Sequence, residues 1–437
     1  MSSLDIFLFE WKHFTRSPFK IIALVLFLTA AIYGLHNGKS LYESQTNKIS
    51  NIEEKANQQL QDYISQYETE EAYQERPEMG KPSWAMDRTE TYNLKKPSPA
   101  MVYSIGQAEQ YGFYKKIRPW ASPYDADMAR EIANPERLQV GSLDFNFVLL
   151  FLLPLLLLIL LYNLKSAEAE QGFLPLIEVQ TTSKNAWLLS RMLFYFILVS
   201  LILMALLFYG AMLTNVFETA SADFGKMLFT TLLYLTFWSV LYFFILKGGK
   251  SILGNTLKMT GIWLFFAFII PATVHQYISI VKPANLMTEL IDANRDKVWE
   301  IYDEPESVIQ PQLNQLYPEI VGSPVLKDST KRDETRRATT VALVNEFKKE
   351  SIELIEQENA QKNRMISHSF WFNPVSFFQN RINRIAQTHY DNYNQHREDI
   401  QTLTDKCLKK MVLDSWHDVK VDKQMYVEYN EMLSQTN

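Results

Sequence analysis

Long apolar runs alternate with polar segments along this chain of 437 residues. The most apolar run, residues 143–162, reads LDFNFVLLFLLPLLLLILLY. A helix of about 20 residues at about 1.5 Å per residue matches the roughly 30 Å hydrocarbon core of a bilayer. Four further runs also predict membrane spans: residues 21–35, 186–213, 227–246 and 259–280. The pattern therefore predicts an all-α polytopic membrane protein with five transmembrane helices.

Residues 1–36 are predicted to hold an entry helix and the first span. Aromatic residues alternate with Lys12, His13 and Arg16, which is typical of an amphipathic helix at a membrane surface, and Pro18 ends it. The apolar run that follows has 15 residues, which is short for a span unless its flanks are included. A signal peptide is the alternative, but the acidic residues before the run and the lack of a small-residue cleavage site argue against it.

Two long polar segments, residues 37–141 and 281–437, predict a mostly helical domain outside the membrane. The first begins with an apolar stripe in steps of three and four, so we expect the first span to continue as a helix until Pro77. A short helix is also expected near residues 124–133. Neither segment shows the alternation of strands, and each alone offers a modest core, so we expect the two to pack together. The stripe residues are Ile49, Ile52, Ala56, Leu60, Tyr63 and Tyr67.

The second polar segment carries its own helix signals. Asn373 followed by Pro374 predicts a capped helix start. Apolar stripes indicate three helices: one that begins at this start, one earlier in the chain and one later. The stripe residues are Val341, Val344, Phe347, Val375, Phe378, Ile382, Ile385, Leu403, Cys407 and Met411.

Charge in the short loops predicts the orientation of the spans. Residues 247–258 carry three lysines and no acid, and residues 163–185 also carry lysines. Residues 215–224 carry two acids and no base. Because positive charge marks the cytoplasmic side, we expect a cytoplasmic N-terminus and both long polar segments outside.

Composition argues against several function classes. The net charge is −6 and no basic patch occurs, so no nucleic-acid binding is expected. The single Cys407 excludes an internal disulfide framework. The sequence GGKS at residues 248–251 resembles the end of a phosphate-binding loop, but Phe244 stands where that loop needs glycine. His389 and His396 lack metal-ligand spacing, and no catalytic constellation is visible, so we expect neither a metal site nor an enzyme.

The interiors of the five apolar runs contain no Asp, Glu, Lys or Arg, and Arg191 and Lys226 lie at span ends. Carriers driven by ion gradients usually place ionisable groups at membrane depth. If this chain moves a solute, we therefore expect the energy to come from another subunit.

Residues 163–185, between the second and third runs, form the candidate functional segment. Glu168 and Glu170 can start a short helix, because acidic side chains suit its N-terminal dipole, and Gly172 and Pro175 bound it. Exposed apolar residues on a short loop indicate a docking surface. A helix resting on lipid headgroups fits the same residues equally well. The apolar residues are Phe173, Leu174, Leu176, Ile177 and Val179.

The segment resembles the permease subunits of ABC-2 type exporters, in which a span ends in small residues and glutamates, then a glycine, a leucine-rich turn and the next span. The family usually has an arginine-bearing run before the glycine, whereas Ala169 and Gln171 stand here. Trp263 with Pro271, and FNPVSFFQNRINRIAQ at residues 372–387, resemble a bacterial branch with large outside insertions that includes relatives of gliding-motility components. The matching residues are Glu168, Glu170, Gly172, Leu174, Leu176 and Arg191.

The resemblance implies a permease subunit in the bacterial inner membrane. It implies a coupling helix at this segment that inserts into a separate ABC ATPase, and the ATPase, not this chain, would bind ATP and Mg²⁺. It also implies a second permease copy or homologue and six spans, so we expect a return span after Asn437 or a chain that ends outside. The alternative is a membrane-anchored scaffold or sensor that binds a periplasmic partner. An intramembrane enzyme would need polar groups within the spans.

Overall fold

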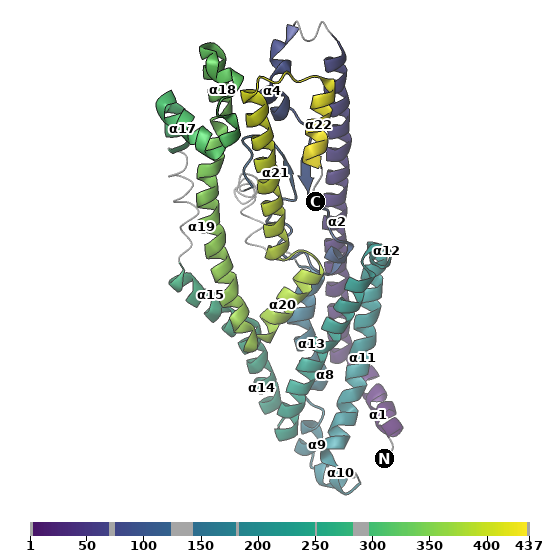
Figure 1. The fold of residues 1–437 in the computed structure, drawn as a ribbon. Coiled ribbons are helices and arrows are strands. Elements are labelled where there is room, and N and C mark those ends of the chain that lie inside the picture. Colours follow the sequence, from purple (N-terminus) through teal and green to yellow (C-terminus); the bar gives the residue numbers. More distant parts are fainter. Residues whose placement is uncertain are drawn as a thin grey trace.

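The computed structural model describes residues 3–69, 75–123, 143–180, 183–249, 251–282 and 297–434. The molecule is elongated, with apolar helices gathered at one end and long polar helices at the other (Figure 1). Five helices are long and apolar enough to cross a membrane, as the sequence predicted, so the chain has the make-up of a multi-pass membrane protein. They are α2 (Pro18–Glu68), the segment Phe145–Glu170, α11 (Lys184–Leu213), α13 (Ser221–Gly248) and the segment Ile252–Val281.

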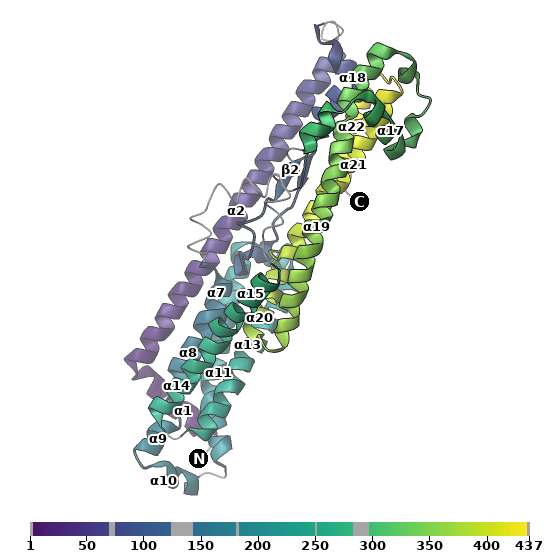
Figure 2. The same cartoon turned by 90° about the vertical axis from the view of Figure 1, so that its left-hand side faces the viewer.

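The first span belongs to a helix of 51 residues, α2, which follows the short entry helix α1 (Ser3–Thr15). Pro18 occupies the first turn of α2, where its missing N–H would have had no partner in any case. At about 1.5 Å per residue, α2 is about 77 Å long and reaches from the span bundle to the far end of the polar helices (Figure 2). The predicted continuation of the span into the apolar stripe is confirmed.

Two glycines let α2 pack closely against its neighbours. A Cβ atom at Gly34 would lie 2.6 Å from the carbonyl carbon of Asp144, at the start of the second span. One at Gly38 would lie 2.5 Å from the carbonyl oxygen of Val102. Both distances are shorter than any side chain tolerates, so backbone contact fixes α2 against these two segments.

The second and fifth spans each contain a π-helical turn, a feature that often marks functional sites. In the second span Pro154 has no N–H to offer the carbonyl of Leu150, and the Tyr234 hydroxyl donates to that carbonyl at 2.7 Å. The Trp263 indole donates to the carbonyl of Phe151 at 3.2 Å. The elements are α7 (Phe145–Phe147), η3 (Val148–Leu152), α8 (Leu153–Leu161), α9 (Ser166–Glu170), α14 (Ile252–Leu264), η4 (Phe265–Ile269) and α15 (Ile270–Val281).

Replacing Tyr234 with phenylalanine is expected to lower the free energy of unfolding by about 1–3 kcal/mol, because it leaves the buried carbonyl of Leu150 without a donor. Thermal unfolding in detergent would measure the change. Tyr277→Phe is the matched control, since Tyr277 is 60 % exposed. Equal stability of the Tyr234 and Tyr277 variants would show that the Leu150 carbonyl finds another donor.

The two long polar segments share one hydrophobic core at the end away from the spans. Tyr67, Met86 and Ile117 come from the first segment, and Cys407 and Trp416 from the second. The helices of this polar domain, with the short turns between them, are η1 (Pro77–Gly80), α4 (Pro82–Asp87), α17 (Glu306–Leu316), η5 (Pro318–Ile320), η6 (Pro324–Lys327), α18 (Ser329–Thr339), α19 (Val341–His368), η7 (Ser369–Trp371), α21 (Tyr390–Trp416) and α22 (Lys423–Ser434). The turn η2 (Pro99–Tyr103), although it belongs to the first polar segment, packs into the core of the spans.

An antiparallel pair of strands, β1 (Tyr92–Leu94) and β2 (Tyr114–Lys116), also lies in this domain. The sequence predicted no strands, because three residues are too few to show an alternating pattern. The short helix expected near residues 124–133 lies outside the described residues.

Helix α20 (Pro374–Ile385) begins where the sequence predicted, and the Asn373 side chain accepts a hydrogen bond from the Ser376 amide at 3.2 Å. The packing partner of this helix differs from the prediction. The sequence predicted that its apolar stripe packs within the polar domain, whereas it packs into the core of the span bundle against α13. Arg381 also donates to the Thr230 hydroxyl of α13 at 3.1 Å. An amphipathic stripe defines which face is buried but not which core it joins.

Candidate functional site

The predicted coupling segment lies at the end of the span bundle that also carries α1 (Figure 1). It forms two short helices, α9 (Ser166–Glu170) and α10 (Leu174–Gln180), where the sequence predicted one. Gly172 separates them with a φ of 77°, a left-handed conformation that favours glycine. The predicted boundary at Gly172 is confirmed, whereas Pro175 lies in the first turn of the second helix, which the sequence did not predict.

Glu168 takes part in a buried ion network and does not face solvent freely. The guanidinium of Arg191, which is 3 % exposed, binds the carboxylates of Glu168 and of Glu10. It also donates to the carbonyl of Leu164 at the end of the second span. Three elements therefore meet at one side chain: the entry helix, the coupling segment and the third span.

The network continues through Tyr195, whose hydroxyl donates to Glu10 at 3.0 Å. The buried ammonium of Lys20 in turn donates to the Tyr195 hydroxyl at 2.9 Å and to the carbonyl of Leu160 at 2.8 Å. Two acidic and two basic side chains thus share one site with no net charge. Buried charges are tolerated only when they are paired and hydrogen-bonded in this way.

Sequence reasoning placed Arg191 at a span end and did not single out Glu10 or Lys20. The available signal was a carboxylate and an ammonium on either side of Pro18, each beside apolar residues. Such groups are rarely fully buried without a partner. Their shared partner, Tyr195, lies 185 residues from Glu10 and 175 from Lys20 in the sequence, so only the fold brings them together.

Glu170 has a structural role of its own. Its carboxylate accepts a hydrogen bond from the amide of Ile252 at 2.7 Å, at the first turn of α14. A negative charge at this position favours the helix dipole. Lys165 donates to the carbonyl of Lys247 at 2.6 Å, so the coupling segment is tied to the fourth and fifth spans as well.

The apolar residues of the segment divide into two groups. Leu174 and Ile177 are half-buried and pack against the core of the spans. Phe173, Leu176 and Val179 are exposed, with Leu176 at 59 % and Val179 at 86 %. We call these three residues the α10 face. It is an apolar surface on a short helix whose other side is anchored to the bundle, which suits a docking site.

Comparisons with known proteins give no relative: no family model, no curated protein and no solved structure matches this chain. The resemblance to ABC-2 permeases therefore rests on the residues named above. Within the described parts of the chain, no group of three or more His, Cys, Asp or Glu side chains could hold a metal ion.

Proposed function

We propose that this chain is the membrane-spanning permease subunit of an ATP-driven ABC exporter. It would couple ATP hydrolysis by a separate ATPase subunit to export of a substrate or to motion of the polar helical domain. In this proposal the protein lies in the bacterial inner membrane with a cytoplasmic N-terminus and an extracytoplasmic polar domain. It pairs with a second copy or a homologous permease, while ATP and Mg²⁺ bind to the ATPase.

The observation that carries the proposal is the exposed α10 face together with the contacts that fix this segment to the spans. A docking helix can transmit a displacement only if it is fixed to the spans. Glu168 ties the segment to Arg191 of α11 and, through it, to Glu10 of α1. Glu170 ties it to the start of α14. A force on α10 would therefore reach two spans and the entry helix at once.

The continuous helix α2 supplies the next step. It contacts the second span and the outer segment around η2, and it also packs against α22 in the polar domain. Close-packed elements transmit displacement because they cannot deform continuously. Tilting of the span bundle would therefore tilt the polar domain with it.

Capture of the ATPase tests this function. Leu176→Asp places a charge in the centre of the α10 face and is expected to reduce co-purification of an ATPase by at least about tenfold, the loss expected for about 1.4 kcal/mol of docking energy. Gly172→Pro, which cannot adopt the positive φ, should act in the same direction. Immunoblotting of the membrane fraction would confirm that both variants are inserted.

Leu354→Asp is the matched control for this experiment. Leu354 is an exposed leucine on α19, in the polar domain. Its replacement should leave the ATPase bound. Retention of the ATPase by Leu176→Asp, or equal loss in both variants, would contradict the docking role of the α10 face.

A membrane-anchored sensor or scaffold is the second candidate function, and one observation favours it. The polar domain and the spans together border a cavity of about 1310 Å³ that could hold a ligand. If purification of the wild-type protein from its native membrane yields no ATPase, the sensor is the better description. Recovery of an ATPase in fixed proportion favours the exporter.

A further inference from the structure

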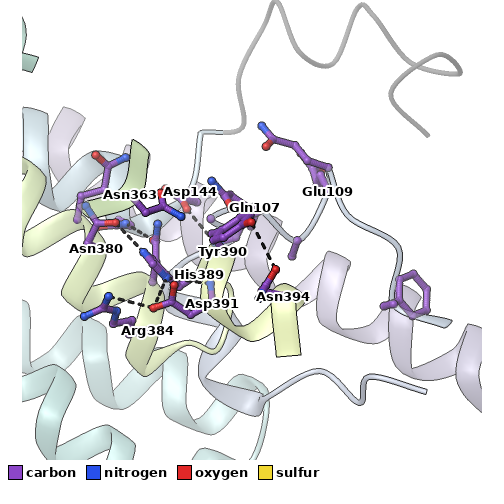
Figure 3. Close-up of a pocket in the computed structure, with 18 of the residues that line it drawn as sticks. Gln107, Glu109, Asp144, Asn363, Asn380, Arg384, His389, Tyr390, Asp391 and Asn394 are labelled. Atoms are coloured by element: carbon purple, nitrogen blue, oxygen red, sulfur yellow. Dashed lines mark hydrogen bonds and ion pairs between the residues drawn. The ribbon is translucent and has the colours of Figure 1, made fainter. Parts of the chain in front are cut away.

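A large cavity lies where the polar domain meets the spans, at the far end of the bundle from α10. Its wall is formed by α2, the loop at residues 105–113, the start of the second span, and helices α19, α20 and α21 (Figure 3). The volume of about 1310 Å³ exceeds the roughly 300–1,000 Å³ of pockets for drug-sized molecules. The cavity therefore has room for a ligand of several linked units.

The lining is polar but carries no dominant charge. Asn and Gln supply twelve of the lining residues, and five acidic side chains face three from Lys and Arg. Mixed charge gives no field that would select a strongly anionic or cationic ligand. A carboxamide offers both a donor and an acceptor, as a hydroxyl group does, so an amide-rich wall matches a ligand with many hydroxyls. Aromatic rings add flat apolar surfaces: Phe113, Phe147, Phe151, Phe370 and Tyr390.

A buried polar cluster on the cavity wall has an unused acceptor. The Ser104 hydroxyl donates to the side-chain oxygen of Asn383 at 2.7 Å. The Asn146 amide nitrogen donates to Ser104 at 3.1 Å and to Asn383 at 3.0 Å. Asn146 is 4 % exposed, and neither its Oδ1 nor Oε1 of Gln107 accepts a hydrogen bond from the described residues. Both oxygens have almost no accessible surface, so the cluster holds the wall in shape and the ligand would meet the exposed atoms of the lining side chains.

The adjoining part of the wall is held in place before any ligand binds. His389 Nδ1 accepts from the amide of Asp391 at 3.2 Å, so the proton lies on Nε2, which donates to Asn380 at 2.8 Å. Burial lowers the pKa of His389, which favours this neutral form. Arg384 binds the Asp391 carboxylate at 3.0 Å, as Figure 3 shows. Fixed polar groups of this kind favour selective binding because less order is lost on association.

We propose that this cavity binds a neutral oligosaccharide. The lining amides would pair with its hydroxyl groups, and the aromatic rings would pack on the apolar faces of the sugar rings. The same glycan could arrive free or as the headgroup of a glycolipid, since Phe147 and Phe151 of the second span line the cavity. Binding does not require an ATPase, so its failure and the failure of the coupling function can be told apart.

Full-length protein in a sugar-free detergent such as lauryldimethylamine oxide provides the test. Maltotetraose, cellotetraose, mannotetraose and tetra-N-acetylchitotetraose are titrated by calorimetry, with tetragalacturonate as the anionic comparison. At least one neutral tetrasaccharide should bind at least tenfold more tightly than the anionic one. A second arm uses nanodiscs with or without digalactosyl diacylglycerol. A rise in melting temperature only with the glycolipid would assign the ligand to the membrane.

Gln107→Leu should weaken binding at least tenfold, because it removes one of the carboxamides that line the cavity. It should not lower thermal stability, because Oε1 of Gln107 accepts no hydrogen bond from the described residues. Gln58→Leu, the same change on the exposed surface of α2, should bind as the wild type does. Three results would overturn the assignment: no detectable binding of any neutral glycan in either arm, tighter binding of tetragalacturonate, or binding by Gln107→Leu equal to that of the wild type.

Discussion

Replacing Arg191 with methionine is expected to lower the free energy of unfolding by about 3–5 kcal/mol. Arg191 is the common partner of the buried carboxylates of Glu10 and Glu168. Methionine fills a similar volume but leaves two acids with Lys20 as the one remaining basic side chain of the network, and Glu10 is fully buried. Breaking a buried pair from one side costs far more than the pair contributes, because the remaining charge is not solvated. Chemical or thermal unfolding in detergent would measure the loss.

A second variant separates charge from packing at this site. Arg191→Met combined with Glu168→Gln removes one positive and one negative charge and leaves Glu10 to be balanced by Lys20 through Tyr195. This double variant should regain at least about 1 kcal/mol relative to Arg191→Met, since residues in one network are coupled. If the free energy of unfolding of Arg191→Met stays within about 1 kcal/mol of the wild type, the stability of the network does not depend on Arg191. Equal stability of the single and double variants would show that packing, not charge, explains the loss.

Acidification from pH 7 to pH 4 is expected to lower the free energy of unfolding by about 3 kcal/mol through His396 alone. Burial, together with the nearby Lys95, lowers the pKa of His396 from 6.5 to about 4, while Asp399 opposes the shift. The unfolded chain therefore binds more protons than the folded chain below pH 6.5, and stability falls until the folded pKa is passed. A difference of about 2.5 pH units at about 1.4 kcal/mol each gives about 3.5 kcal/mol in full, and about 3 kcal/mol of this is lost by pH 4, where folded His396 is half-protonated.

His396→Leu tests the assignment, because leucine fills part of the buried space and does not titrate. Its unfolding free energy should change less between pH 7 and pH 4 than that of the wild type, by about 3 kcal/mol. His368→Leu, at an exposed position on α19, is the control and should keep the wild-type slope. An unchanged slope in His396→Leu would assign the acid sensitivity to other groups.

The charge network and the cavity lie at opposite ends of the same spans. The second span begins at the cavity with Asn146 and ends beside the network with Leu164. Under the proposed function, a ligand at one end and a docked ATPase at the other would bias the same helix. Measuring glycan affinity in Leu176→Asp would reveal whether the two ends are coupled, since coupling between sites is reciprocal.

The sequence by itself determined the spans, the long first helix and the end of a short helix at Gly172. These features depend on local rules. An apolar run of bilayer length can adopt few structures other than a transmembrane helix. Apolar residues in steps of three and four indicate that a helix continues. A residue with a positive φ is most often glycine. The start of α20 at Asn373 and Pro374 followed from cap chemistry in the same way.

Only the tertiary structure decided what these elements touch. The stripe of α20 could have joined either core, and the fold placed it on α13. The sequence indicates no partner for Glu168 or Glu170. In the fold, Glu168 pairs with Arg191 and Glu170 accepts a hydrogen bond at the start of α14. The cavity draws its wall from segments that lie hundreds of residues apart. Periodicity and composition define which face of a helix is buried, but not its partner, because partners are selected by packing of the whole chain.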